Sequence, residues 1–166
     1  MNKYILISLV IAVALFLLLR DKKPVVASAE IVANAPIQKV WEIETDLYNW
    51  SDWNSDIESM EVKGDIGLGT VFVWKAGGIT IESIITEYEP YTRIAWKGKI
   101  FGIDAYHVWK FTDRGDSTHI STEEKFSGIL PWLLPGTMRV KIDKALKHGV
   151  EVLKNAAENK SPNNAN

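Results

Sequence analysis

Residues Thr70–Gly128, TVFVWKAGGITIESIITEYEPYTRIAWKGKIFGIDAYHVWKFTDRGDSTHISTEEKFSG, decide the fold. Apolar and polar side chains alternate along five runs of this stretch, and short turns rich in Gly, Pro and Asp separate the runs. Alternation with a period of two is typical of strands with one buried face, and short polar turns join such strands into hairpins. The stretch therefore predicts four consecutive antiparallel hairpins, formed by residues 70–75, 78–88, 93–99, 104–111 and 117–128.

The positions of the turns assign each side chain to one face of the predicted sheet, because directly opposed residues of a hairpin share a face. The opposed pairs that we predict are Trp74–Ile79, Ile85–Trp96, Trp96–His107 and Trp109–Ile120. A slip of one residue would mix apolar with charged side chains, whereas a slip of two would change the partners and keep the faces. The assignment of side chains to faces is therefore a firmer inference than the assignment of directly opposed pairs.

One of the two faces is aromatic and aliphatic, with the polar groups His107 and Glu124 among its apolar residues. Ser83, Gly98 and Ala105 form a row of small residues on it, which leaves room for a cavity between large neighbours. We expect this cavity to bind a small hydrophobic molecule. The expected lining residues are Phe72, Trp74, Ile81, Ser83, Ile85, Trp96, Gly98, Ala105, His107, Trp109, Ile120, Thr122 and Glu124 from the sheet, and Met138, Ile142 and Leu146 from the helix that follows it.

The sequence on either side supplies further elements of the same domain. Residues 25–33 are rich in Val, Ile and Ala and predict a strand, and residues 36–46 predict a helix that a second short helix follows. Residues 136–157 predict a long amphipathic helix whose apolar face covers the sheet. A chain of 166 residues without internal repeats is the size of one domain.

This domain is expected to span residues 25–157. Residues 1–24 are interpreted as a membrane anchor and linker, and residues 158–166 as a disordered polar tail.

The N-terminal segment Tyr4–Leu19 has sixteen residues without a charge, and Lys3 and Arg20 bracket it. A transmembrane helix needs about 20 apolar residues, with about 17 as the usual minimum, so we predict a short single-pass anchor. A cleaved signal peptide is the alternative, since Ala27–Ala29 resembles a cleavage site, and the domain would then be exported. That site falls inside the first predicted strand, which favours an uncleaved anchor. The side of the membrane on which the domain lies stays open.

Composition and charge exclude several classes of function. The net charge of −2 combines +3 on residues 1–24 with −5 on the remainder, so the domain lacks the basic surface that nucleic acid requires. The chain has no cysteine, no HExxH metal-binding motif and no glycine-rich phosphate or dinucleotide loop. The spacing of His107, His119 and His148 is not that of metal ligands, and we expect neither a metal nor a cofactor.

Several motifs resemble the SRPBCC/START-like superfamily, which includes polyketide cyclase/dehydrase-like proteins, START lipid-transfer domains and the birch-pollen-allergen fold. They are NAPIQKVW at residues 34–41, WSDWN at 50–54, GLGT at 67–70 and EKFSG at 124–128. The resemblance covers about residues 25–157. It implies an α+β helix-grip fold: a curved antiparallel sheet of about seven strands wrapped on a long C-terminal helix, with two short helices after the first strand. It also implies a deep hydrophobic pocket between sheet and helix. The N-terminal transmembrane helix that we predict from Tyr4–Leu19 precedes this fold.

His107 and Glu124 are the sharpest candidates for chemistry. The predicted register places them diagonally on adjacent strands, with Cβ atoms about 5–8 Å apart. A carboxyl group that close would orient the imidazole for ligand contact, or for acid–base catalysis of the cyclase or dehydratase type. A buried structural pair without chemistry is an equally open interpretation.

We therefore weigh three functions. A membrane-anchored domain that binds a lipid, quinone or polyketide-like molecule leads, followed by an enzyme that uses His107 and Glu124, and then by a protein-interaction or chaperone-like module. Trp132, Leu133 and Leu134 lie between two prolines and form either a lid, a membrane contact or ordinary packing.

Overall fold

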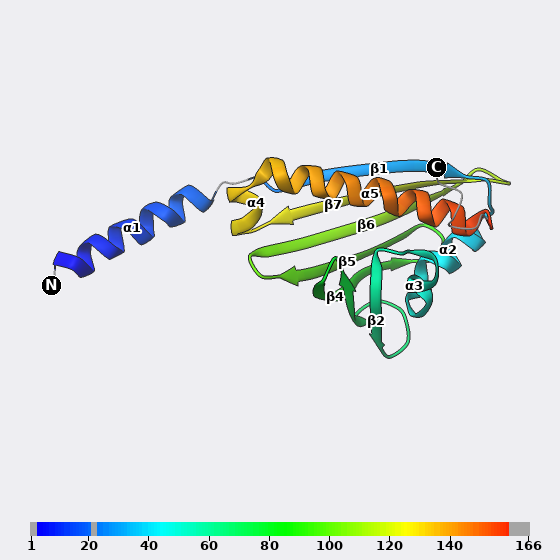
Figure 1. The fold of residues 1–166 in the computed structure, drawn as a ribbon, viewed down its shortest axis with the longest axis horizontal. Coiled ribbons are helices and arrows are strands. Elements are labelled where there is room, and N and C mark those ends of the chain that lie inside the picture. Colours follow the sequence, from blue (N-terminus) through cyan, green and yellow to red (C-terminus); the bar gives the residue numbers. More distant parts are fainter. Residues whose placement is uncertain (1–2, 21–22, 160–166) are drawn as a thin grey trace.

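The computed structural model describes residues 3–20 and 23–159 (Figure 1). The elements are, in order, α1 (Lys3–Arg20), β1 (Val25–Ala33), α2 (Ile37–Thr45), the 3-10 turn η1 (Leu47–Asn49), α3 (Trp50–Trp53), β2 (Ile57–Lys63), β3 (Val71–Ala76), β4 (Ile79–Glu89), β5 (Arg93–Ile100), β6 (Ile103–Asp113), β7 (Thr118–Ser127), α4 (Ile129–Leu133) and α5 (Pro135–Ala157).

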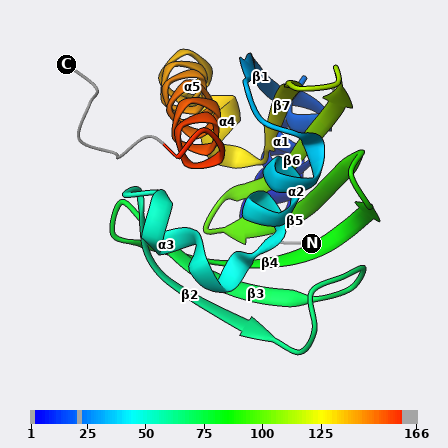
Figure 2. The same ribbon diagram turned by 90° about the vertical axis from the view of Figure 1, so that its right-hand side faces the viewer.

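The sheet has seven antiparallel strands in the described residues, in the order β1-β7-β6-β5-β4-β3-β2. Figure 2 shows the sheet curving so that its concave side faces α5, which lies along β1 and β7. On the same side α2 contacts α5 and β6, and α3 contacts β2. This arrangement confirms the predicted α+β helix-grip architecture.

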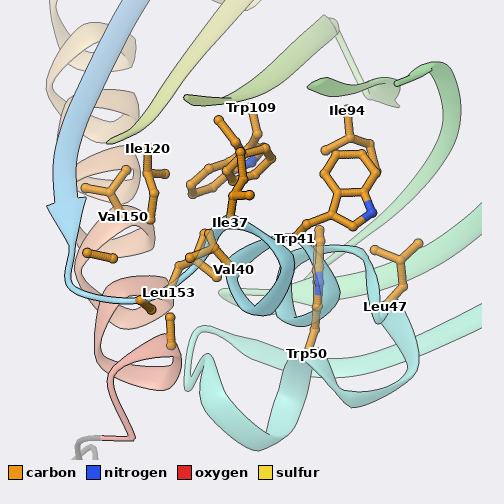
Figure 3. Packing of buried hydrophobic residues seen from close by; sticks show 14 of the residues in the cluster. Ile37, Val40, Trp41, Leu47, Trp50, Ile94, Trp109, Ile120, Val150 and Leu153 are labelled. Carbon is orange, nitrogen blue, oxygen red and sulfur yellow. The ribbon is translucent and has the colours of Figure 1, made fainter. Parts of the chain in front are cut away.

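The long helix α5 is held by its apolar face. Pro135 stands at its start, where a missing N–H costs nothing. Ile142, Leu146, Val150 and Leu153 recur at helical spacing and are buried. The first two join Val25 and Ala27 of β1 in a small apolar cluster, whereas the last two join the main core. Figure 3 shows this main core, in which Trp41 and Ile37 of α2 lie below Trp109 and Ile94 of the sheet.

The predicted division of the sheet into two faces is confirmed, and two of the four predicted registers are corrected. Ile85 pairs with Trp96, and Trp96 with His107, as predicted. Trp74 instead lies opposite Ile81, and Trp109 opposite Thr122. Both differences are slips of two residues, which exchange partners without moving a side chain to the other face.

Turn chemistry explains the two slips. Gly77 and Gly78 both have positive φ, 55° and 77°, so they form a two-residue turn between Ala76 and Ile79. In the last hairpin Asp113 still pairs with Thr118, and its carboxylate accepts a hydrogen bond from the N–H of Gly115. Each turn is therefore centred one residue later than the sequence indicated.

The N-terminal segment is a helix, and the predicted transmembrane span is not found in it. Helix α1 spans Lys3–Arg20 and exposes apolar side chains such as Ile5 and Leu9. In the described part of the chain, no helix combines the length and the apolar character needed to cross a bilayer. Figure 1 shows α1 projecting from the end of the domain at which α4 lies. Most of the predicted polar tail, residues 160–166, lies outside the described residues.

Candidate functional site

His107 and Glu124 lie directly opposite each other on β6 and β7. The predicted diagonal arrangement is therefore wrong, because the later turn moves β7 by two residues relative to β6. His107 Nδ1 is 3.9 Å from Glu124 Oε1, and their side chains are only 12% and 14% exposed. In the same cross-strand row, Trp96 of β5 lies opposite His107, and Ala27 of β1 lies opposite Glu124. The pair thus lies between the main core, which contains Trp96, and the small cluster, which contains Ala27.

The other ring nitrogen of His107 is held by Thr122. His107 Nε2 lies 2.8 Å from Thr122 Oγ1, and the hydroxyl of Thr122 donates its proton to the carbonyl of Val108 at 3.0 Å. A hydroxyl has one proton to donate, so the oxygen must accept the Nε2–H of the imidazole. The neutral imidazole is therefore in the Nε2–H tautomer, and its Nδ1 lone pair faces the carboxyl of Glu124.

Burial shifts both ionisable groups toward their neutral forms. It lowers the pKa of His107 to about 3 and raises the pKa of Glu124 to about 8. Between these values the pair holds one proton, which burial places on the carboxyl. Near neutral pH the site therefore presents a carboxylic acid beside an imidazole with a free lone pair, and it carries no net charge.

Aromatic rings surround the imidazole. The ring centroid of His107 is 4.8 Å from that of Trp96 and 5.6 Å from that of Trp109. The far edge of the Trp109 ring lies against α5, where a Cβ on Gly149 would stand 3.5 Å from it. The buried Nε1 of Trp109 has no hydrogen-bond partner within residues 3–20 and 23–159. A buried N–H without an acceptor is costly, and an acceptor on a bound molecule would satisfy it.

The predicted row of small residues exists. Ser83 pairs with Gly98, and Gly98 with Ala105, which in turn pairs with Phe126. Part of the expected space is filled, because a Cβ on Gly98 would stand 2.9 Å from Ser83 Oγ. That hydroxyl also accepts a hydrogen bond from Trp74 Nε1 at 3.1 Å.

The exposure of the expected lining residues varies along the concave face. The buried ones are Phe72, Ile81, Ser83, Ile85, Trp96, Gly98, Trp109, Ile120, Thr122, Ile142 and Leu146, and the partly exposed ones are Trp74, Ala105, His107, Glu124 and Met138. Ala105 lies in the row next to the His107–Glu124 pair, on the side toward α4, and its partner Phe126 is also partly exposed. The concave face is therefore more accessible at its α4 end.

A hollow of about 230 Å³ lies at that end, lined by Lys23, Phe126, Ser127, Gly128, Ile129, Pro131 and Trp132. A larger one of about 550 Å³ lies beside β1, where outward-facing Ser28, Glu30, Lys110 and Glu123 meet Lys147 and Glu151 of α5. Its charged lining does not fit an apolar ligand, whereas the lining of the smaller hollow includes the aromatic residues Phe126 and Trp132.

Glu44 is a buried carboxyl group that the sequence analysis did not single out. Its side chain is within the fully buried part of α2, and both carboxyl oxygens lack a hydrogen-bond partner among the described residues. Burial raises its pKa well above the usual value. The signal was present in the sequence, because Glu44 continues the helical spacing of Ile37, Val40 and Trp41 and so places an acid on an apolar face.

Comparison with known proteins fits this geometry. Residues 24–158 match the family described as "Polyketide cyclase / dehydrase and lipid transport". The chain belongs to this family. No curated protein matches the chain.

Solved structures share the fold at low sequence identity. The START superfamily protein from Mycobacterium smegmatis is 18% identical, with a TM-score of 0.67 over 81% of this chain and 97% of that one. The Zhui aromatase/cyclase from Streptomyces sp. R1128 is 16% identical, with a TM-score of 0.66 over 80% and 93% of the two chains. The hypothetical protein jhp0584 from Helicobacter pylori is 19% identical, with a TM-score of 0.71 over 80% and 87%.

Proposed function

We propose that the protein binds a small, uncharged hydrophobic molecule on the concave face, between the sheet and α5. The observation that supports this most is the group His107, Glu124 and Thr122 within an aromatic surface, in which His107 and Glu124 are partly accessible. Pockets for apolar ligands combine such a lining with a few polar groups that orient the ligand. A lipid, a quinone and a polyketide-like molecule all have this chemistry.

The carboxylic acid of Glu124 adds a hydrogen-bond donor to this face, and the unpartnered Nε1–H of Trp109 is a second donor, buried beneath it. Both favour a ligand that carries acceptor oxygens. An anionic ligand would leave a charge without a partner beside Glu124, which is costly in an apolar environment.

Native mass spectrometry and organic extraction of the purified full-length protein test the proposal. A co-purifying molecule, or saturable binding of a naphthoquinone or a fatty-acid ester, is the expected result. His107→Ala should weaken binding about tenfold through loss of one hydrogen bond and of ring contact. His119→Ala is the matched control, since His119 lies on the outer face beside Glu30. If the wild-type protein binds nothing by either method, the proposal is wrong.

A second candidate function is acid–base catalysis of the cyclase or dehydratase type. It is favoured by the Nδ1 lone pair of His107 directed at Glu124, because a neutral imidazole and a carboxylic acid side by side form a base and an acid near neutral pH. The family description and the likeness to an aromatase/cyclase support it. Under this hypothesis Glu124→Gln abolishes turnover of a bound poly-β-ketone while its affinity stays within a few-fold. Equal loss of affinity and turnover would leave binding alone as the role.

We also propose that α1 attaches the domain to lipid. Leu9, Val13 and Phe16 are 57%, 49% and 65% exposed. Apolar residues on the other sides of the helix are exposed as well. Leu9→Lys with Val13→Lys should reduce flotation of the full-length protein with phospholipid vesicles. Leu68→Lys, at an exposed position in the β2–β3 connection, is the control.

A further inference from the structure

An exposed apolar surface lies at the end of the domain from which α1 projects. We define this end surface by Phe101, Ile129, Leu133 and Leu134, which are 93%, 56%, 55% and 50% exposed. Large apolar side chains scattered singly over a surface are ordinary, whereas a contiguous group marks a contact site. Phe101 comes from the β5–β6 turn and the others from α4 and its C-terminus, so two segments of the chain contribute.

Backbone contacts hold these two segments together. The N–H of Leu130 donates to the carbonyl of Gly102 at 3.1 Å, which joins α4 to the β5–β6 turn. Gly128 approaches the same turn so closely that a Cβ would stand 2.5 Å from Gly102 O. Gly128 has a φ of 114°, which only glycine adopts without strain. The end surface is therefore a fixed feature of the fold rather than two independent loops.

The segment that contains α4 and the start of α5 is basic, whereas the domain as a whole is acidic. Residues 129–142 contain Arg139 and Lys141 and no acidic residue, and both basic side chains are exposed. Lys23 lines the hollow beside α4. A domain with an excess of acidic residues thus has cationic side chains beside its apolar end. Apolar side chains with cations around them suit the boundary between acyl chains and anionic headgroups.

We propose that the end surface docks on an anionic phospholipid membrane, with Phe101 and Leu133 inserted at the headgroup boundary. Docking there places the 230 Å³ hollow at the membrane, so a hydrophobic ligand can pass between the lipid and the concave face. The proposal extends the attachment by α1 and is separable from it, because the end surface has its own residues and its own measurement.

The cysteine-free chain permits a direct test. Single variants Phe101→Cys and Leu133→Cys of the full-length protein are labelled with an environment-sensitive fluorophore. Leu68→Cys is the matched control, since Leu68 is 74% exposed on the β2–β3 connection, at the β2 edge of the sheet. Vesicles of phosphatidylcholine with phosphatidylglycerol should increase the emission at positions 101 and 133 and shift it to shorter wavelength, with no change at position 68.

A charge variant tests the headgroup contact. In the Phe101→Cys protein, Arg139→Gln should require about five-fold more anionic lipid for half of the emission change, as expected for one basic residue at a membrane surface. Lys63→Gln, on an exposed residue of β2, should have no effect. Vesicles of phosphatidylcholine alone should give a weaker response than the anionic ones.

Three results would overturn the docking. The first is an unchanged emission at positions 101 and 133 in protein that floats with the vesicles, which leaves attachment by α1 and ligand binding intact. The second is an equal change at position 68. The third is a change that depends on protein concentration without lipid, which would assign the end surface to contact between two copies of the chain.

Discussion

The hydroxyl of Thr122 fixes the tautomer of His107. Thr122 Oγ1 accepts the Nε2–H at 2.8 Å because its own proton is donated to Val108 O. The lone pair of Nδ1 is thereby directed at Glu124, and the orientation of the imidazole depends on a neighbour that has no acid–base chemistry of its own.

Thr122→Val should release this tautomer. We expect the ¹⁵N chemical shifts of His107 to change from the Nε2–H form toward a mixture of tautomers, with a loss of about 1–3 kcal/mol in the free energy of unfolding. Thr118→Val is the control, because its buried hydroxyl donates to Ala35 O and is remote from the imidazole. It should cost a similar free energy and leave the tautomer unchanged. A pure Nε2–H form in Thr122→Val would contradict the assignment.

Glu124→Gln should remove a loss of stability at alkaline pH. The pKa of Glu124 is 4.5 in the unfolded chain and about 8 in the folded protein, so the native state binds this proton more tightly. The stabilisation of the folded state that results is complete below pH 4.5 and is lost as pH rises toward 8. His107, with a lowered pKa of about 3, has the opposite effect below pH 6.5. The two effects cancel between pH 4.5 and 6.5.

Between pH 6.5 and 8 only the effect of Glu124 remains, which amounts to about 2 kcal/mol for 1.5 pH units. Urea unfolding of wild type and variant at both pH values measures this difference. Glu123→Gln is the control, since its carboxylate lies on the other face beside Lys125. If the free energy of unfolding changes equally with pH in wild type and Glu124→Gln, the pKa of this carboxyl group is not shifted by folding.

Gly98→Ala should destabilise the sheet at the row of small residues. The added Cβ would approach Ser83 Oγ to 2.9 Å and Ile81 Cγ2 to 3.2 Å, so Ser83 must move and its hydrogen bond from Trp74 weakens. We expect a cost of about 1–3 kcal/mol in chemical denaturation. Gly67→Ala, where no atom lies within 4 Å of the new Cβ, should be nearly neutral.

Glu44→Met should stabilise the protein. A buried carboxyl group without a partner costs about 1–3 kcal/mol, and an apolar side chain of similar length removes that cost. Because burial raises the pKa of Glu44, the cost grows as pH rises above the unfolded pKa, so the gain should be larger at pH 8 than at pH 5. Glu42→Met, on the exposed side of α2, should have little effect on the melting temperature. If Glu44→Met melts below the wild type, the carboxyl group has a partner that stabilises it.

The faces of the sheet could be predicted because apolar and polar residues alternate through four hairpins, and a one-residue error at any turn would have been visible. The directly opposed residues on adjacent strands could not be predicted, because a two-residue slip leaves that alternation intact. Only the φ angles of Gly77 and Gly78 and the hydrogen bond of Asp113 distinguish the two registers. The sequence therefore predicts that His107 and Glu124 are neighbours, but it places them diagonally rather than directly opposite each other.

Two elements carried too weak a pattern for a prediction from the residues alone. Strand β2 is half exposed and pairs with β3 through an irregular register between Ile57 and Ser59, so its alternation is broken. The short α4 lies between Gly128 and Pro135 and holds a proline of its own at position 131, a composition typical of a loop. The position of α4 depends on a segment distant in the sequence, because the N–H of Leu130 donates to the carbonyl of Gly102. Strand β2 is an edge strand that, among the described residues, pairs with β3 alone.

The separation of the apolar residues into two clusters gives the two halves of α5 different resistance to local opening. Val150 and Leu153 belong to the main core, whereas Ile142 and Leu146 are held by a cluster of few residues. Local opening is cheapest where few apolar contacts must be broken, so backbone amides around Ile142 should exchange with solvent deuterium faster than those around Leu153. The first half of the helix can then lift from β1 while the second half stays packed, and the concave face opens beside Glu124 without unfolding of the domain.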